Sequence, residues 1–557
     1  MSNKLWEKYE SGKRYNNSFK EDYYSSVKTH NDFYIGNQWQ GIDSNNNLPH
    51  PTFNIAKRII DFKTASICGN KIAVQIQPLQ NVSLEQDSYS LTDIVDAEIE
   101  NIMEKNRLDD LIRDLLTDGA TSGDMCTHII FNPDNELTRN VKGSIEIELV
   151  DCTNVIFGNP NIKDVDKQPW VAIVGRDLVE NLKAEQKELK GKGEIVKDSE
   201  TLYQASDYKE DIESDSEGKA LYIYLYERDS KTGTIKASKG TQDAIIFENI
   251  DTQRVRYPIA FENWYSNKNS YHGRGEMEGI IPNQIYLNKA MAMAQYHTMQ
   301  SSFPLTLFNT NKIEALSNKI GGAVGIALDE SKGETFNNVI RNLEPVNMSS
   351  HIINIIELCM QYTKECMGIS DASLGNIDPK NTSAIIAVQK SNSIPLENVK
   401  SNLYNIIEQM VLIMVEMMGV NYGIRPVFMK TETGYEEVMF DFDTLNNIDT
   451  KINIDIGTGS YYSEIALIQT LDNLLMNGQI TLLQYLERIP DELITKKQEL
   501  INDIKELQAG QQEGQQQQYE QMAQFVESLP PEEQQRLQSL APEEMEKEVL
   551  RMMGGAV

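Results

Sequence analysis

Residues 257–300 read YPIAFENWYSNKNSYHGRGEMEGIIPNQIYLNKAMAMAQYHTMQ, and this stretch decides the fold. It begins as a short apolar and aromatic run typical of a β-strand and continues through a polar segment that contains two glycines. It ends in a long helix, which we predict over about 275–300. Pro282 falls near the first turns of this helix, where a missing N–H group is tolerated. A strand-rich part of the chain therefore passes directly into one long helix.

A second helix follows this one after a compact insert. The insert, residues 301–348, contains SFPLTLFN, a short helical piece and the glycine-rich GGAVGIAL, which predicts a small α/β unit. We predict the second helix over 349–367. Residues 368–383, GISDASLGNIDPKNTS, have the composition of an exposed loop that ends in a helix N-cap. A further helix is expected over about 384–418, broken by Pro395.

The flanking parts of the chain alternate between helix and strand patterns. We predict helices at about 3–34, 53–67 and 91–116, and a mainly β region over 125–264 that is interrupted by a charged stretch at 181–218. Strand patterns return in VFMKTETGYEEVMFDF and KINIDI, and the last hundred residues are helical apart from a Gln-rich segment. A chain of 557 residues with this order is an α+β protein of several domains.

The composition limits the possible partners. The chain has 83 acidic and 52 basic side chains and a formal net charge of −31, which opposes tight binding to nucleic acid. Either the acidity only keeps the protein soluble, or it faces DNA that must slide past. The five cysteines form no CxxC pair, which favours a reducing compartment and no disulfide framework. The most apolar run, 410–415, stops at Glu416, so we expect no membrane span and no secretory leader.

The sequence gives no support for catalysis. None of the six histidines lies in HExxH or at a metal-ligand spacing with cysteine, and there is no GxxxxGK[ST] or GxSxG motif. The glycines of HGRGEMEG have the spacing G-x-G-x-x-x-G, which differs from a dinucleotide fingerprint. We therefore expect no catalytic residue, no metal and no cofactor, and a protein that is not an enzyme. An enzyme of unrecognised type remains an alternative.

The order of these elements resembles the portal proteins of tailed bacteriophages. The stretches FYIGNQWQG, YPIAFENWYSNKNSYHGRGEMEGIIPNQIYLNKAMAM and GISDASLGNIDPKNTSAIIAVQKSN are also similar to that family. The resemblance implies a multi-domain α+β portal fold with a mixed β-rich wing, long stem helices, a clip and a crown. Its implied segments are an N-terminal helical arm (1–60), a wing (61–270, with returning strands at 420–460), stem helix 1 (271–300), a clip (301–348), stem helix 2 (349–367), a tunnel loop and channel helix (368–419) and a helical crown with a Gln-rich C-terminal segment (461–557).

The same resemblance implies a function and a set of partners. A portal protein forms a dodecameric ring, a head-tail connector at one capsid vertex of the virion. The ring is the conduit for double-stranded DNA during viral genome packaging and ejection. The implied partners are other copies of the chain, the terminase large subunit, the head-tail adaptor protein and the major capsid and scaffolding proteins, met in the host cytoplasm during assembly, with no membrane. Another non-enzymatic capsid or tail-assembly protein is the alternative.

Two groups of residues are candidate sites under this interpretation. Lys380, Asn381 and Lys390 belong to the loop and the helix after it, where they either form a solvated surface or make transient phosphate contacts in the channel. The apolar residues of the insert either form its core or dock the packaging motor and the adaptor. They are Phe303, Leu305, Leu307 and Phe308.

Overall fold

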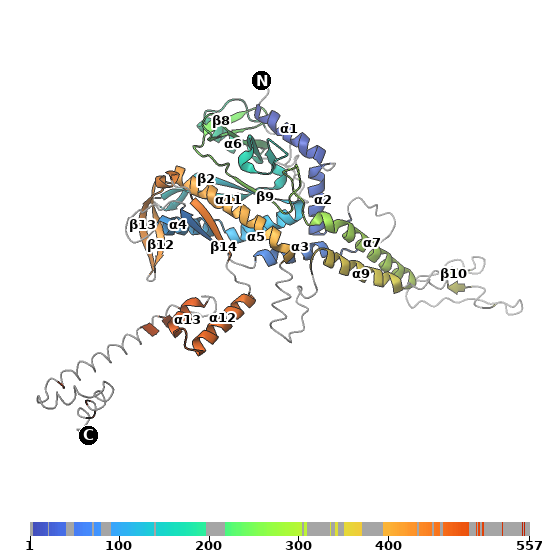
Figure 1. The fold of residues 1–557 in the computed structure, drawn as a ribbon. Helices are drawn as coiled ribbons and strands as arrows, with labels where there is room; N and C mark the ends of the chain where they lie inside the picture. Colours follow the sequence, from blue (N-terminus) through green and yellow to red (C-terminus); the bar gives the residue numbers. More distant parts are fainter. Residues whose placement is uncertain are drawn as a thin grey trace. The chain divides into compact units, whose positions relative to one another are not determined.

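The computed structural model describes most of the chain up to residue 489. The described residues are 4–19, 22–39, 49–68, 72–78, 91–138, 141–196, 218–302, 306–308, 340–342, 350–369, 394–431, 434–447, 450–456 and 461–489, with a few single residues elsewhere. The chain divides into two compact units, residues 1–457 and 458–557. Helices and sheets are mixed, which confirms the predicted α+β class (Figure 1).

The helices lie at both ends and in the middle of the first unit. They are α1 (Lys4–Ser18), α2 (Tyr23–Ile35), α3 (Ile55–Cys68), α4 (Leu91–Lys105), α5 (Leu108–Ser122), α6 (Val179–Glu188), α7 (Met277–Ser302), α9 (Ser350–Cys366) and α11 (Glu397–Asn421). The second unit contains α12 (Tyr461–Met476) and α13 (Leu482–Arg488), the latter begun by a capping box between Thr481 and Gln484.

The strands among the described residues form five antiparallel sheets. The largest has the order β4 (Val155–Phe157), β5 (Trp170–Leu178), β6 (Lys219–Arg228), β7 (Ile235–Gly240) and β8 (Ile245–Asp251). A second has the order β3 (Val141–Leu149), β2 (Asp124–Thr138) and β9 (Ile259–Asn263). The two-stranded sheets pair β1 (Ile72–Pro78) with β14 (Thr450–Ile456), β10 (Thr306–Phe308) with β11 (Ile340–Asn342), and β12 (Ile424–Thr431) with β13 (Gly434–Asp441).

Helix α1 covers one face of the five-stranded sheet. Its Leu5 and Tyr9 are buried against Ile156, Ala172 and Leu221. Residues in β5 and β6 are buried on both faces, because a second core cluster fills the opposite side. The N-terminal helix is therefore part of the sheet domain, since its removal would expose this apolar face to water.

Helix α11 is the central core helix of the first unit. Twelve of its residues, from Val399 to Gly419, are buried, and the helix packs against β2, β9, β14 and α4. With its preceding turn it is long and apolar enough to cross a membrane by length and composition, but 61% of the most apolar window is buried inside this domain. Core packing therefore accounts for its apolar composition. Pro395 lies in the short 3₁₀ turn Ile394–Leu396 that leads into α11.

The structure corrects two features of the sequence analysis. The stretch 91–116, expected as one helix, forms α4 and α5, which meet at Arg107 in the left-handed region (φ 50°). Strand β1 was not predicted at all, and it pairs with β14 in the register Ile72↔Ile456 to Pro78↔Thr450. Both features depend on contacts with distant parts of the chain.

Candidate functional site

Helices α7 and α9 form an antiparallel hairpin that carries the insert between them. Their shared core contains Leu287, Ala290 and Ile356, with Met291 and Met360 partly buried beside it. Figure 1 shows the two helices side by side with β10 beyond their far ends, where β10 pairs with β11. The predicted spans 275–300 and 349–367 are found at Met277–Ser302 and Ser350–Cys366. The expected pair of long helices around an insert is therefore present.

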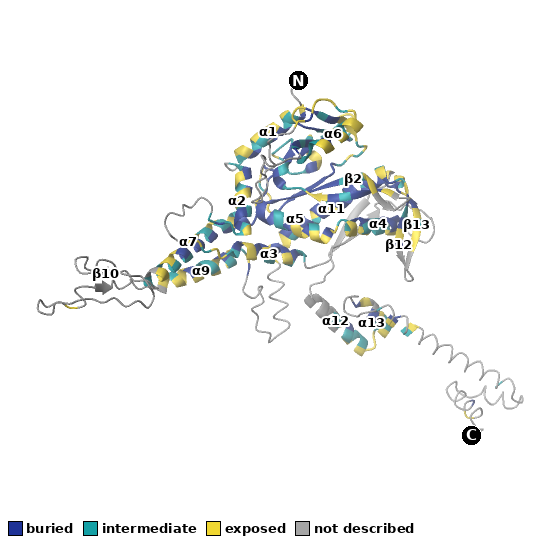
Figure 2. Cartoon of the chain, turned by 180° about the vertical axis from the view of Figure 1, so that it is seen from behind, coloured by how far each residue is buried: buried dark blue, intermediate teal, exposed yellow. Residues whose placement is uncertain are grey.

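One side of this hairpin exposes large apolar side chains. The shared core marks the sides on which α7 and α9 face each other, and from there helical periodicity places one group of apolar residues on the same side of the antiparallel pair: Tyr286, Met293, Ile355, Leu358 and Tyr362. Each of the five is between 44% and 58% exposed, and Figure 2 shows exposed positions along both helices. We call these five residues the hairpin face. An exposed apolar surface of this kind marks a site of protein association.

A buried polar chain anchors the base of α7 to the N-terminal helices. Gln284 Oε1 accepts hydrogen bonds from the backbone N–H groups of Ile55 (3.1 Å) and Ala56 (3.2 Å), so a side chain of α7 caps the first turn of α3. Gln284 Nε2 donates to Asn288 Oδ1 (2.9 Å), and Asn288 Nδ2 donates to Gln38 Oε1 (2.7 Å). The direction of the hairpin is therefore fixed by hydrogen bonds as well as by apolar packing.

A buried ion pair holds the start of the same helix. Lys63 of α3 contacts Glu276, and both side chains are about 5% exposed or less. The other carboxylate oxygen of Glu276 accepts a hydrogen bond from Trp264 Nε1 (3.0 Å). Removing one partner of such a pair leaves a buried, uncompensated charge.

The glycines of HGRGEMEG serve backbone packing. A Cβ atom on Gly273 would lie 2.6 Å from the carbonyl oxygen of Gly123, and one on Gly275 would lie 2.7 Å from that of Ala120. Gly123 itself ends α5 in the left-handed region (φ 105°). The loop before α7 thus lies directly against the α5–β2 turn, which explains its glycines without a phosphate ligand.

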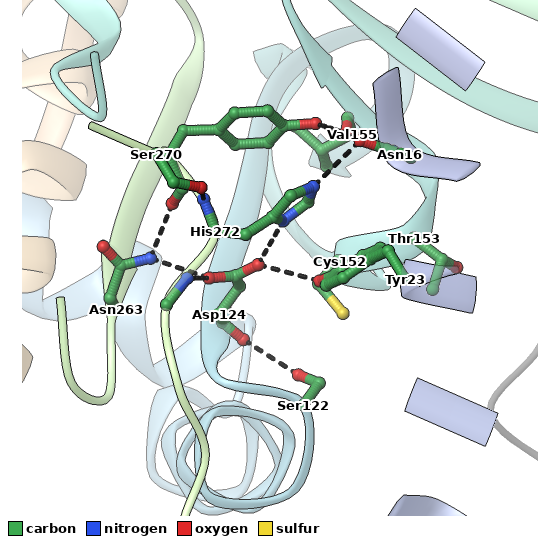
Figure 3. Close-up of polar contacts among 12 residues, drawn as sticks. Asn16, Tyr23, Ser122, Asp124, Cys152, Thr153, Val155, Asn263, Ser270 and His272 are labelled. Atoms are coloured by element: carbon green, nitrogen blue, oxygen red, sulfur yellow. Dashed lines mark hydrogen bonds and ion pairs between the residues drawn. The ribbon is translucent and has the colours of Figure 1, made fainter. Parts of the chain in front are cut away.

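Asp124 and His272 form the centre of a second buried network, which we call the Asp124 junction (Figure 3). The Asp124 carboxylate accepts hydrogen bonds from Tyr23 Oη (2.8 Å), His272 Nδ1 (2.7 Å), Asn263 Nδ2 (2.7 Å) and the Gly273 N–H (2.7 Å). These donors come from α2, from β9 and from the loop before α7. The junction therefore joins three separate parts of the first unit.

Both ring nitrogens of His272 have partners in the junction. Its Nε2 lies 2.9 Å from Asn16 Oδ1, an oxygen that also accepts from Tyr271 Oη (3.0 Å), while Asn16 Nδ2 donates to Tyr24 Oη. His272 thus connects Asp124 of β2 with Asn16 of α1 through its two ring nitrogens.

The Asp124 junction contains residue types of a catalytic site but lacks the geometry of one. Asn16, Asp124 and His272 are at most 1% exposed, so no substrate reaches them. Burial, together with the charges of Asp151 and Asp124, raises the pKa of the Cys152 thiol well above its usual value, and burial also raises the pKa of Tyr23. Neither group is a nucleophile at neutral pH. In the described part of the chain, no group of three or more His, Cys, Asp or Glu side chains is placed to hold a metal ion.

Most sequence-predicted site residues lie outside the described residues. This applies to Lys380, Asn381 and Lys390 and to Phe303 and Leu305. Leu307 and Phe308 belong to β10 and pair with Arg341 and Ile340 of β11.

Arg425, one of the few prominent cations of the sequence, is not available to DNA. It is 8% exposed, donates to the Gly143 carbonyl (3.0 Å) and lies 3.8 Å from the ring centre of Tyr422. Arg425 therefore supplies a hydrogen-bond donor to a backbone carbonyl group of β3.

Neither the hairpin face nor the Asp124 junction was predicted from the sequence. The hairpin face had a signal, because SHIINIIELCMQY has apolar residues around more than one side of its helix, which is more than one partner helix can cover. The junction had none, since Asn16 and His272 are 256 residues apart. No protein-family model matches the chain, and no curated protein matches it.

Proposed function

We propose that this chain is the portal protein of a tailed bacteriophage, a structural subunit of a dodecameric ring at one capsid vertex. In this proposal the ring is the conduit through which double-stranded DNA enters during packaging and leaves during ejection. The wing is the β-rich part, the stem is the α7–α9 hairpin, the clip is the segment between the two helices, and the crown is the helical C-terminal unit.

The observation that carries the proposal is the α7–α9 hairpin with its exposed apolar face. The hairpin is anchored by Gln284 and Glu276 to the N-terminal helices, while five large apolar side chains of its other surface face solvent in the single chain. An isolated soluble subunit gains nothing from such a face, whereas a subunit packed beside identical copies buries it.

The charge of the chain suits a channel for moving DNA. Duplex DNA carries one negative charge for roughly every 1.7 Å of its axis, so an acidic wall repels it and keeps it from sticking. The net charge of −31 is consistent with such a wall. In the proposal, the terminase large subunit supplies the energy for packaging, and the clip docks first the terminase and later the head-tail adaptor.

The direct test is the mass and shape of the purified protein. We expect native mass spectrometry to give a closed ring of about twelve copies and end-on electron micrographs to show a central hole. A monomer or dimer across a wide range of protein and salt concentrations would refute the portal assignment. Open or filamentous assemblies would instead favour another capsid or tail-assembly protein.

A further inference from the structure

The β12–β13 hairpin exposes an apolar surface. Residues 425, 427 and 429 of β12 face inward, and Val427, Met429 and Phe440 belong to the main core. On the other face, Ile424 is 69%, Phe428 49% and Met439 60% exposed. Because the pairing puts Phe428 opposite Glu437 and Ile424 opposite Asp441, these five residues share one face of the hairpin. We call this face the strand patch.

The strand patch has an acidic border. Residues 424–443 contain one cation besides the buried Arg425, which is Lys430, and five carboxylates. Glu437 and Asp441 are exposed beside the apolar side chains. A surface that binds here therefore needs apolar side chains next to positive charge.

Such a surface exists on the same chain, at the corner where α2 ends and α3 begins. Ile35 and Phe53 are 49% and 47% exposed, and the chain segments that carry them are joined by a hydrogen bond from Asn54 Nδ2 to the carbonyl oxygen of Tyr34 (2.8 Å). The first turns of α3 add two exposed cations, Arg58 and Lys57, of which Lys57 also pairs with Asp61 at 3.7 Å.

The same corner has a hollow beside its charges. It is lined by Asn54, Lys57, Arg58, Asp61 and Phe62. Together with Ile35 and Phe53 we call this surface the helix corner. Its apolar side chains and cations are the features that the strand patch requires of a partner.

The two surfaces lie at opposite ends of α11, so they do not meet within one chain. Near the start of α11, Asn402 Nδ2 donates to the carbonyl oxygen of Trp264, which is linked through Glu276 to Lys63 of α3. The strand patch begins just after α11 ends at Asn421. At 1.5 Å per residue these ends of α11 are roughly 28 Å apart, and Figures 1 and 2 both show α3 and the β12–β13 hairpin at different ends of the helix.

We propose that the strand patch of one subunit binds the helix corner of the next copy of the chain. This inference rests on the proposed ring and adds a contact outside the α7–α9 hairpin. Two different complementary surfaces at opposite ends of a subunit give a head-to-tail interface, which forms a ring when the rotation between copies closes and a filament when it does not. In the contact, Phe428 and Met439 pack against Ile35 and Phe53, while Glu437 and Asp441 face Lys57 and Arg58.

A charge-exchange experiment on the full-length chain tests this contact. One variant carries Glu437→Lys and Asp441→Lys, a second carries Lys57→Glu and Arg58→Glu, and a third carries all four substitutions. A control with Glu180→Lys and Glu188→Lys makes the same change in net charge as the first variant on the exposed face of α6. The readout is the protein concentration at which half of the chain is assembled, measured by analytical ultracentrifugation at low salt.

We expect each two-site variant to need at least about tenfold more protein for assembly, because like charges then face each other. The four-site variant should assemble within about threefold of the unmodified protein, since the charges again oppose. The control should assemble normally. Rescue in the four-site variant also excludes misfolding as the cause of the losses.

The outcomes separate this inference from the proposed function. If the unmodified protein forms rings and the two-site variants assemble equally well, the strand patch does not bind the helix corner, while the portal assignment stands. The same conclusion follows if the four-site variant fails while the control assembles. If the unmodified protein forms no ring, both proposals are wrong.

Discussion

Replacing Asp124 by asparagine removes the negative charge at the centre of the Asp124 junction. In the unmodified protein the Asp124 carboxylate accepts four hydrogen bonds, from Tyr23, His272, Asn263 and Gly273. The asparagine amide has one accepting oxygen, and its NH₂ group, itself a donor, takes the place of the second carboxylate oxygen and faces donors there. Tyr23 Oη and His272 Nδ1 share one carboxylate oxygen of Asp124, and water cannot replace that acceptor inside the protein.

The size of the effect follows from burial. Leaving a buried donor without its acceptor costs about 1–3 kcal/mol. The side chains of Asp124 and His272 are fully buried, and the NH₂ group of asparagine faces two donors at one position. We therefore expect Asp124→Asn to lower the free energy of unfolding of the first unit by about 2–6 kcal/mol. Because Asn16 and Tyr23 belong to the junction, α1 and α2 should detach first.

Urea unfolding followed by circular dichroism measures the loss, and limited proteolysis reports the release of the N-terminal helices. The matched control is Asp134→Asn, since Asp134 is exposed on the same strand β2. The control should change the free energy of unfolding by less than about 0.5 kcal/mol. If Asp124→Asn behaves like the control, the junction does not hold the domain together.

Three further predictions concern pH, assembly and packaging. Burial, reinforced by two neighbouring carboxylates, raises the pKa of Asp118 from 3.8 to about 7. Between pH 4 and 7 the folded protein therefore keeps a proton that the unfolded chain loses, and the free energy of unfolding falls as the pH rises. Asp118→Asn should therefore be more stable than the unmodified protein at pH 8 by about 1–2 kcal/mol. The whole pKa shift corresponds to ~4 kcal/mol, but the side chain keeps some contact with water, which reduces the gain. Denaturant unfolding at pH 4 should show no gain. On the hairpin face, Leu358→Glu should leave the unfolding midpoint unchanged but prevent ring formation, as measured by ultracentrifugation. The control Glu357→Gln should assemble normally. If both variants form rings, the hairpin face takes no part in assembly. Lys380→Glu should leave the ring intact and reduce the nuclease-protected DNA per capsid, and normal packaging by this variant would remove the proposed phosphate contact.

The regular elements could be predicted because local periodicity determines them. The stretch that begins at residue 257 contains both a strand and the start of a long helix, and α7 and α9 were placed within two residues of their observed ends. The break between α4 and α5 was not foreseen, since the apolar pattern continues across it and the turn residue, Arg107, is neither glycine nor proline.

The buried polar residues could not be predicted for a different reason. Asparagine, aspartate and histidine are usually found at surfaces, and their burial is stable only when distant partners complete their hydrogen bonds. Asn16 and Asp124 both contact His272, at separations of 256 and 148 residues. Such a network depends on the finished tertiary structure, of which the sequence pattern carries no trace.

The pairing of β1 with β14 has a consequence for synthesis of the protein on the ribosome. Strand β1 starts at Ile72 and its partner starts at Thr450, so about 380 residues separate the two. At about 5–20 residues per second, a nascent chain carries β1 for roughly 20 to 75 seconds before its partner exists. During this time the strand IAVQIQP is open to pairing with other chains. The yield of correctly folded subunits should thus depend on what protects one short strand while the rest of the domain is still being translated.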